Sequence, residues 1–496
     1  MTDVENLPET LTKIVATIGP ASASEEMLER LIRAGARVFR INFSHGAPEE
    51  HAEWVRRIRA VGAKIGEPPA ILGDLPGPKI RLNPVPGGSV ELHTGGLVSV
   101  GRAPAPNGAA EDSVPWLSTT FPGLVDEVMP GNRLLIADGA VRTLVVDKTE
   151  TSIRCTVTHG GVVSTGKGVN LPDTEVSLAP LTARDRRHVA WALAHEVDFL
   201  AMSFVRRAQD LRELRRLIED EAERAGHPGL RVSIVAKIEL PSAVRGIDEI
   251  LDVTDAIMIA RGDLGVEMDL AQVPVIQKDL ISRAQHHGTP CIVATQMLES
   301  MIDAPAPTRA EASDVAGAIL DRVDAVMLSG ETAVGRFPDL AVTHMRRIAE
   351  CTEAHLAETI TVPSPPGRLQ ASGYHTAALA HGVLTVARDI RATWLVVWSQ
   401  AGGGARYLSQ NGFPIPILAV TSDVRAARQM QLLRGVTPLP MPAPVDIAAF
   451  IDHIDRYLRE RGRAEVGDDI IVMAGEPLGE VGVTNRMEIR VIGSGE

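Results

Sequence analysis

The segment from Ser233 to Met268, SIVAKIELPSAVRGIDEILDVTDAIMIARGDLGVEM, decides the fold class of this chain. Residues 233–236 form a short apolar run, and residues 256–260 are entirely apolar, as in a strand that is buried on both faces. Between these runs, Pro241 opens a helical stretch that ends near Leu251. The segment therefore predicts one and a half βα units of a parallel sheet.

Polar side chains appear only where these two strands stop. Lys237 and Glu239 lie two residues apart, so an extended chain points them to the same side, and Arg261 and Asp263 follow the next strand at the same depth. Magnesium takes one or two carboxylates together with water and phosphate oxygens. A lysine beside it can neutralise a phosphoryl group during transfer. Taken alone, a Lys-x-Glu pair is more often a salt-bridged strand end. Whether this pair belongs to a functional site therefore depends on the other strand ends of the chain.

The same βα rhythm continues on both sides of this segment and gives eight strands. Eight parallel strands close a (β/α)8 barrel, and a doubly wound open sheet is the competing arrangement. The strand count and the polar strand ends favour the barrel. A helix over 24–34 with Ser24 as its cap and a helix over 47–61 lie between the first strands. The predicted strands are residues 13–18, 37–41, 70–74, 198–202, 233–236, 256–260, 290–294 and 324–328.

Two regions depart from this rhythm. From about residue 76 to residue 178 the chain is rich in Gly, Pro, Thr and Val with short alternating runs, which predicts a small inserted β domain. Beyond a long helix after Pro338 and the linker VPSPPG, helices and strands alternate again and predict a separate C-terminal α/β domain. The predicted domains are residues 1–75 with 179–345 for the barrel, 76–178 for the insertion and 346–496 for the C-terminal domain.

Composition limits the partners of the chain. A net charge of −13 over 496 residues argues against nucleic acid or an acidic membrane surface as a general partner, so an anionic substrate would need a local basic pocket. The three cysteines, Cys155, Cys291 and Cys351, are too few and too far apart for a disulfide framework or a zinc site. No signal-like or membrane-spanning apolar stretch is present. We therefore expect a protein of the reducing cytoplasm.

Side chains suited to phosphate, metal or carboxylate follow every predicted barrel strand except the first. In barrels of this kind the catalytic groups lie at the carboxyl ends of the strands. Each residue alone could be a surface ion pair, a cap or a backbone hydrogen-bonding group, but that explanation does not account for their joint placement on one rim. The residues are Arg40, Asn42, Ser44, His45, Asp74, Ser203, Lys237, Glu239, Arg261, Asp263, Thr295, Gln296, Ser329 and Glu331.

Several stretches, in order along the chain, resemble the pyruvate kinase family. The resemblance implies a (β/α)8 barrel, an inserted small β-barrel domain that closes as a lid, a C-terminal regulatory domain and, usually, a homotetramer. The stretches are KIVATIGPAS from Lys13, RINFSHG from Arg40, DLPGPKIR from Asp74, KGVNLP from Lys167, AKIE from Ala236, ARGDLGVE from Ala260, ATQMLESM from Ala294, PTRAEASDVA from Pro307, AVMLSGETAVG from Ala325 and GVTNRMEIRVIG from Gly482.

The resemblance also implies a reaction, in which the phosphoryl group of phosphoenolpyruvate passes to ADP and the resulting enolate is protonated to pyruvate. By motif, Glu239 and Asp263 would hold Mg²⁺ or Mn²⁺. Lys237 and Arg40 would bind the moving phosphoryl group, and Thr295 would relay a proton near the enolate carbon. The other residues implied are Gly262, Asp263, Ser203 and Ser329 for the substrate, and Pro20, Asn42, His45, Arg81 and Arg184 for the nucleotide.

Lys79 departs from the commoner family pattern. Many members carry Glu at this position and hold potassium with residues that match Asn42, Ser44, Asp74 and the carbonyl of Leu75. The word DLPGPKIRL instead resembles the potassium-independent branch, and a lysine ammonium supplies the same single positive charge. We therefore predict activity without K⁺. The alternative is that Lys79 points to solvent and the ion still binds.

The resemblance leaves the effector open. Family members that bind a sugar phosphate often have several hydroxyls after the C-terminal strand, whereas residues 399–404 keep one, that of Ser399. A helix that begins after glycines can still bind an anion. We expect another phosphorylated effector, or none, in place of fructose 1,6-bisphosphate.

Two other functions use many of the same residues. A magnesium-dependent lyase or aldolase that stabilises a pyruvate enolate would also need Glu239, Asp263 and Arg40, but it would not need an inserted lid with Arg81. A catalytically silent regulatory paralogue usually lacks a catalytic lysine or a metal ligand. This chain keeps Lys237, Glu239 and Asp263, so the kinase is favoured over both.

Overall fold

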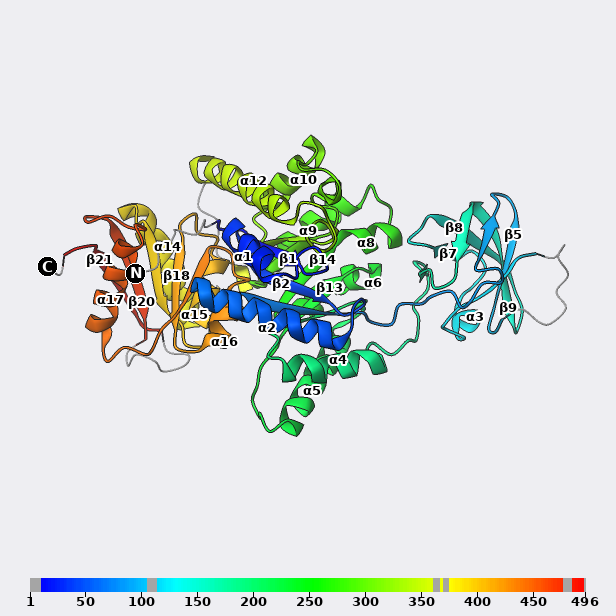
Figure 1. Cartoon of the computed structure of the whole chain (residues 1–496), viewed down its shortest axis with the longest axis horizontal. Coiled ribbons are helices and arrows are strands. Elements are labelled where there is room, and N and C mark those ends of the chain that lie inside the picture. The colour runs from blue at the N-terminus through cyan, green and yellow to red at the C-terminus, as the bar shows by residue number, and fades with distance from the viewer. Residues whose placement is uncertain (1–9, 105–113, 360–365, 369–373, 476–483, 495–496) are drawn as a thin grey trace.

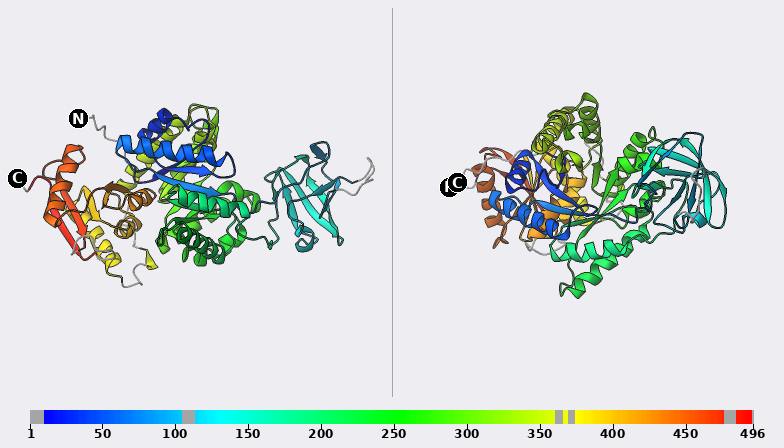
Figure 2. Two further views of the ribbon diagram at one scale, coloured as in Figure 1. Left: turned by 60° about the horizontal axis from the view of Figure 1, so that its bottom comes forward. Right: turned by 45° about the vertical axis from the view of Figure 1, so that its right-hand side comes forward.

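The computed structural model describes residues 10–104, 114–359, 366–368, 374–475 and 484–494. Three bodies follow one another along its longest axis: the C-terminal domain, a barrel covered by helices, and a β domain (Figure 1). The β domain is inserted after the third barrel strand, so the chain leaves the barrel there and returns to it (Figure 2). The carboxyl end of that strand therefore faces the β domain.

Eight parallel strands close the barrel in the order β1-β16-β15-β14-β13-β12-β3-β2. This closure confirms the predicted (β/α)8 fold and excludes the open doubly wound sheet. Side chains such as Val15, Leu72 and Met258 fill the interior, and alternate residues pack outward against the helices. The strands are β1 (Lys13–Thr17), β2 (Ala36–Asn42), β3 (Ala70–Leu75), β12 (Phe199–Met202), β13 (Ser233–Ile238), β14 (Ala256–Ala260), β15 (Cys291–Ala294) and β16 (Ala325–Leu328).

Local signals fix the ends of the barrel helices. Ser24 caps the first helix as predicted, since its hydroxyl accepts a hydrogen bond from the Met27 amide at 3.2 Å. The stretch predicted as one helix after Pro241 is two short helices that meet at Gly246. No helix in the described ranges is long and apolar enough to cross a membrane. The helices are α1 (Glu25–Ala34), α2 (Pro48–Ile65), α4 (Ala183–Ala194), α5 (Ala208–Arg224), α6 (Pro241–Arg245), α7 (Ile247–Leu251), α8 (Arg261–Glu267), α9 (Val273–His287), the 3₁₀ helix η1 (Glu299–Ile302), α10 (Arg309–Leu320), α11 (Gly330–Ala333) and α12 (Pro338–Thr359).

The inserted β domain is an open, curled half-barrel. A six-stranded sheet in the order β11-β7-β8-β9-β5-β6 and a two-stranded sheet of β10 and β4 enclose a core that includes Val98, Leu134 and Ile153. Cys155 is a free thiol in this core, and Cys291 and Cys351 are free as well. The elements are β4 (Ser89–Leu92), β5 (Leu97–Gly101), β6 (Trp116–Ser118), α3 (Leu124–Glu127), β7 (Arg133–Ile136), β8 (Val141–Lys148), β9 (Ser152–His159), β10 (Gly161–Ser164) and β11 (Val169–Asn170).

The C-terminal domain is a five-stranded sheet in the order β19-β18-β17-β20-β21 with helices packed on both faces. Its strand β19 contains Pro438 and Pro440, which argue against a strand in the sequence. The strand lies at the sheet edge, where a missing N–H costs no ladder bond. The elements are α14 (His375–Ile390), β17 (Trp394–Trp398), α15 (Gly403–Gln410), β18 (Ile417–Thr421), α16 (Val424–Met430), β19 (Val436–Pro440), α17 (Ile447–Glu460), β20 (Asp469–Ala474) and β21 (Arg486–Val491).

A buried ion pair joins the C-terminal domain to the amino-terminal end of the barrel. Asp198, just before β12, is fully buried and accepts hydrogen bonds from Arg428 Nε and Arg59 Nη2, both at 2.7 Å. Leu432 packs within the core cluster of the barrel strands. The long helix α12 packs on α1 and α10 and spans the expected boundary at residues 345–346.

Candidate active site

The carboxyl ends of four neighbouring barrel strands bring Arg40, Asp74, Ser203 and Lys237 together. The strands β2, β3, β12 and β13 are adjacent in the barrel. Asp74 lies at the centre: Arg40 Nε is 2.7 Å from one carboxylate oxygen, and Lys237 Nζ is 3.3 Å from the other. Lys237 Nζ also donates to Ser203 Oγ at 2.7 Å. Two cations are therefore fixed side by side on a buried anion.

The charges of this cluster stabilise one another. Burial alone would raise the pKa of Asp74, but the Lys237 ammonium and the Arg40 guanidinium outweigh it and lower that pKa. Burial favours the neutral form of Lys237, yet the Asp74 and Glu239 carboxylates outweigh it and raise its pKa above the usual value. Lys237 is therefore a permanent cation over the physiological range.

Glu239 is the second anion beside Lys237. Its Oε1 atom is 2.8 Å from Lys237 Nζ, and its Oε2 atom accepts a hydrogen bond from the Phe204 amide at 2.7 Å. Phe204 has a φ of 56°, a conformation that an aromatic residue rarely adopts. The residue with this unusual backbone is the one whose amide donates to Glu239. Glu239 is thus oriented from two sides.

Glu239 and Asp263 offer oxygen donors that suit magnesium. Burial raises the pKa of Glu239 despite Lys237, and the Asp263 charge raises it further, so additional positive charge would be favourable here. Among the residues that the structure describes, no group of three or more His, Cys, Asp or Glu side chains could hold a metal. Two carboxylates without a closed cage fit Mg²⁺, which keeps several waters and takes further oxygens from phosphates.

A strained turn carries Thr295. Thr295 and Gln296 follow β15 with φ values of 68° and 55°, unusual above all for a β-branched residue. Arg261 holds the turn, since Nη2 donates to the Thr295 carbonyl at 2.8 Å and to the Gln296 carbonyl at 3.1 Å. The Thr295 hydroxyl accepts a hydrogen bond from the Gly262 amide at 2.8 Å. The amide expected to bind the substrate carboxylate is therefore bonded to the expected proton relay.

Ser329 has an unused hydroxyl on the same rim. Its backbone amide donates to Glu331 Oε2 at 2.7 Å, and Glu331 also accepts from the Leu298 amide at 3.1 Å. The Ser329 hydroxyl is buried and has no hydrogen-bond partner in the part of the chain that the structure describes. A buried hydroxyl of this kind is available to a ligand.

The residues expected to bind the nucleotide or potassium are more dispersed. Pro20, His45 and Arg81 are exposed, and Arg81 Nη1 donates to the Gly166 carbonyl at 3.0 Å within the β domain. Arg184 Nη2 donates to the Phe43 carbonyl at 2.7 Å. Four residues were expected to hold potassium: Asn42, Ser44, Asp74 and Leu75. Asn42 Oδ1 accepts a hydrogen bond from the Ser44 amide at 3.1 Å, and Leu75 is buried. Each oxygen of Asp74 contacts one cation, Arg40 or Lys237, as described above.

Lys79 points toward the rim. Its Nζ atom is 3.2 Å from Asp138 Oδ1 in the β domain and 4.0 Å from Asp263 Oδ1 on the barrel. Its side chain is 25% exposed, which argues against the alternative that it points into solvent. A cavity of about 1010 Å³ opens beside it between the two domains and is lined by Asn170, Phe204 and Glu267 among others. Its lining includes neither Lys237 nor Arg40, so this cavity lies beside the cluster around Asp74 and does not contain it.

The expected effector loop in the C-terminal domain uses its hydroxyl internally. Ser399 Oγ accepts a hydrogen bond from the Ala405 amide at 3.2 Å, so it is bonded within the first turn of α15. Gly402, just before that helix, has a φ of 82°, which explains a glycine at this position.

Three functional contacts were not predicted from the sequence. Arg40 Nη1 donates to the hydroxyl of Thr17 at 3.1 Å, so the first barrel strand also contributes to the rim. In the sequence, the position of Thr17 at the end of the first barrel strand could have identified it as a rim residue. Asp138 binds Lys79, as described above. Asn170 Nδ2 donates to Glu267 Oε1 at 2.6 Å and joins the β domain to the barrel.

The Glu267 contact should depend on pH. Burial raises the pKa of Glu267 from the model-compound value of 4.5 to about 7, and the Asp263 charge adds to it against the Asn170 hydrogen bond. The folded protein then binds more protons than the unfolded chain between these two pH values, so this group lowers stability as pH rises from 4.5 to 7. We expect Glu267→Gln to match the wild type in thermal midpoint at pH 5 and to exceed it by about 2–4 °C at pH 8.

Differential scanning fluorimetry without magnesium would measure this difference. The variant Glu91→Gln, at an exposed site in the β domain, serves as the control and should show no difference at either pH. Equal midpoints for Glu267→Gln and the wild type at pH 8 would contradict the raised pKa.

Comparisons with known proteins agree with this geometry. Residues 9–342 match the family described as "Pyruvate kinase, barrel domain", and residues 377–490 match "Pyruvate kinase, alpha/beta domain". A pyruvate kinase of Staphylococcus saprophyticus is 40% identical over 484 residues, 97% of this chain and 80% of the relative. One of Staphylococcus aureus is 39% identical over the same shares. The crystal structure of a pyruvate kinase from Cryptosporidium parvum superposes with a TM-score of 0.88 at 32% identity, covering 97% of this chain and 96% of that one.

Proposed function

Because the chain belongs to the pyruvate kinase family, we propose that it transfers the phosphoryl group of phosphoenolpyruvate to ADP at the rim around Lys237, and that it needs no potassium. The chain is a phosphotransferase that forms pyruvate and ATP. The observation that supports this location best is a pair of cations, the partly buried Arg40 and the buried Lys237, held by one buried carboxylate at the carboxyl end of the barrel.

The two cations would bind the phosphoryl group during its transfer. The transition state of this reaction spreads negative charge over the phosphoryl oxygens, so catalysis depends on donors fixed in advance. Arg40 is fixed by Asp74 and Thr17, and Lys237 by Asp74, Glu239 and Ser203. Neither side chain has to reorganise when the charge moves.

Thr295, Gly262 and Ser329 would surround the remaining part of the substrate. The Thr295 hydroxyl and the Gly262 amide are bonded to each other, so substrate binding would exchange this bond for contacts to the carboxylate. The Thr295 hydroxyl, which donates to the Ala294 carbonyl at 2.6 Å, would then relay a proton from water to the enolate carbon and recover its own proton from that water. Ser329 supplies a further hydroxyl that has no partner in the described chain.

Glu239 and Asp263 would hold the magnesium ion. When bound, the ion would supply positive charge that stabilises the negative charge of the substrate. The Phe204 amide and Lys237 keep Glu239 in place without it. Arg81, His45, Pro20, Asn42 and Arg184 would line the nucleotide side, and closure of the β domain would exclude water from the phosphoryl group.

Replacing Glu239 tests the metal assignment. We expect Glu239→Gln to raise the Mg²⁺ concentration that gives half-maximal activity by at least about 10- to 100-fold, since even outer-shell partners of a metal cost this much. The change keeps a hydrogen-bond acceptor and removes one charge. A coupled assay of pyruvate formation over a series of Mg²⁺ concentrations measures the shift.

The matched control is Glu331→Gln. Glu331 is another buried carboxylate of the same rim, and its hydrogen-bond donors among the described residues are backbone amides, including those of Leu298 and Ser329. The Glu331→Gln variant should have the Mg²⁺ dependence of the wild type, even if it is less stable. A Glu239→Gln enzyme with the wild-type Mg²⁺ dependence would place the ion elsewhere.

A further inference from the structure

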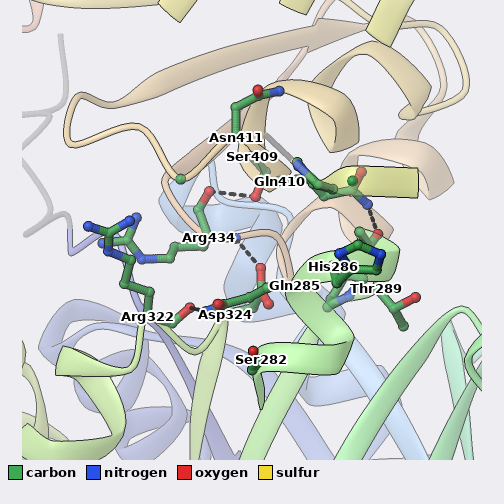
Figure 3. A pocket seen from close by; sticks show the side chains of 15 residues that line it. Ser282, Gln285, His286, Thr289, Arg322, Asp324, Ser409, Gln410, Asn411 and Arg434 are labelled. Atoms are coloured by element: carbon green, nitrogen blue, oxygen red, sulfur yellow. Dashed lines mark hydrogen bonds between the residues drawn. The ribbon is translucent and has the colours of Figure 1, made fainter. Parts of the chain in front are cut away.

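A second cavity, of about 270 Å³, lies between the amino-terminal end of the barrel and the C-terminal domain (Figure 3). On the barrel side it is lined by the last turn of α9 and by Arg322 and Asp324, which precede β16. On the other side it is lined by the end of α15 and by Arg434, which precedes β19. It lies at the opposite end of the barrel from Lys237.

Two arginine side chains in this cavity lack anionic partners. Arg434 is 6% exposed, and its Nη1 atom donates only to the Phe413 carbonyl at 3.2 Å, while its Nε atom has no hydrogen-bond partner among the described residues. The Arg322 side chain makes no hydrogen bond or ion pair with any residue that the structure describes. Figure 3 shows the two guanidinium groups close together on one side of the cavity.

The pKa values of both arginines are lowered in the folded protein. Burial lowers the pKa of Arg322, and the positive charge of Arg434 lowers it further. Burial also lowers the pKa of Arg434. Both shifts show that the two guanidinium groups are held partly out of water, where an anionic ligand would stabilise their charged forms.

The nearby carboxylates are already committed to backbone amides. Asp324 accepts hydrogen bonds from the Cys291 amide at 2.9 Å and the Arg434 amide at 3.4 Å, and burial raises its pKa to about 6. Glu353, whose charge acts on Arg434, accepts from the amides of Leu11 and Thr12. A third arginine, Arg406, donates to the Gly288 carbonyl close by. Neither carboxylate forms an ion pair with Arg322 or Arg434.

We propose that this cavity binds the phosphate group of a small phosphate monoester between Arg322 and Arg434. A phosphate dianion balances two guanidinium charges, and the planar donors of arginine match its oxygens in pairs. The volume lies at the lower end of the range for ligand sites, which suits a three- or four-carbon ester and not a nucleotide.

Such a ligand would join two domains of the chain. Arg322 belongs to the barrel and Arg434 to the C-terminal domain, so one phosphate would contact both. Arg322 stands just before β16, the four-residue strand that ends next to Ser329 on the catalytic rim. The site is thus placed to influence activity, and the binding itself does not depend on the function proposed above.

Binding of glycerol 3-phosphate to the full chain tests the proposal. The active-site rim also attracts phosphate, so the titrations are made by calorimetry in an Arg40→Gln background, which weakens that site. We expect glycerol 3-phosphate to bind in this background and Arg322→Gln to weaken the binding by at least about tenfold, the loss expected for charged hydrogen bonds. Because the Arg322 side chain makes no hydrogen bond or ion pair with the described residues, its replacement should not lower the thermal midpoint.

Arg391→Gln is the matched control. Arg391 is another arginine with a left-handed backbone, with a φ of 55° against 61° for Arg322, and it is exposed and does not line the cavity. Equal binding by the Arg322→Gln and Arg391→Gln proteins would overturn the proposal. Inorganic phosphate that binds as tightly as the ester would overturn the assignment to a monoester, because the cavity would then recognise only the free anion.

Discussion

Replacing Lys237 with methionine should lower kcat by about 10²- to 10³-fold, the usual cost of removing one preorganised donor from a charged transition state. Methionine keeps much of the volume of the side chain and removes the ammonium that bonds Ser203, Asp74 and Glu239. Arg40 remains on Asp74, so the phosphoryl group would keep one of its two cations. A coupled assay at saturating phosphoenolpyruvate, ADP and Mg²⁺ measures the change in kcat.

Stability has to be measured alongside this variant. Loss of Lys237 leaves Glu239 buried with the Phe204 amide as its other hydrogen-bond donor, and breaking a buried ion pair typically costs about 3–5 kcal/mol. Circular dichroism and the thermal midpoint show whether the protein is still folded at the assay temperature. Lys278→Met is the control. Lys278, an exposed residue of α9, pairs with Asp321 at the end of α10, and its replacement should leave kcat unchanged. A folded Lys237→Met enzyme with more than a tenth of the wild-type kcat would remove Lys237 from the chemistry.

The barrel could be predicted from the sequence because its strands are fully apolar and its helices have local end signals. Strands such as AIMIA at 256–260 contain no polar residue. Ser24 caps its helix through a hydrogen bond to an amide only three residues away. The elements that were not predicted individually include β19, β21 and α17 of the C-terminal domain. For β19 the reason is physical: two prolines argue against a strand unless the strand is known to lie at a sheet edge, and only the tertiary structure shows that.

The candidate site could also be predicted only in part from the sequence. Residue types at strand ends were visible in the sequence, because the barrel rule places all carboxyl ends on one rim. Contacts that join distant segments were not, and they include Arg40 with Thr17, Lys79 with Asp138, and Asn170 with Glu267. These three pairs depend on barrel closure and on the position of the β domain, neither of which follows from local periodicity.

Activity without potassium is the last expected result, and Lys79 is its proposed cause. In a buffer with tetramethylammonium as the only monovalent cation, we expect full wild-type activity. Lys79→Met should lose about 10²-fold of that activity, because the ammonium near Asp263 and Asp138 is then absent from the rim.

Adding K⁺ separates a missing charge from a damaged site. If Lys79 replaces the ion, K⁺ should restore part of the activity of Lys79→Met and leave the wild type unchanged, since the side chains of Asn42 and Ser44 are still present. Lys64→Met, which removes an exposed lysine of α2, should behave as the wild type in both buffers. A wild-type enzyme that needs K⁺ would instead mean that the Lys79 ammonium, although it points toward the rim, does not supply the charge that the transferred phosphoryl group requires.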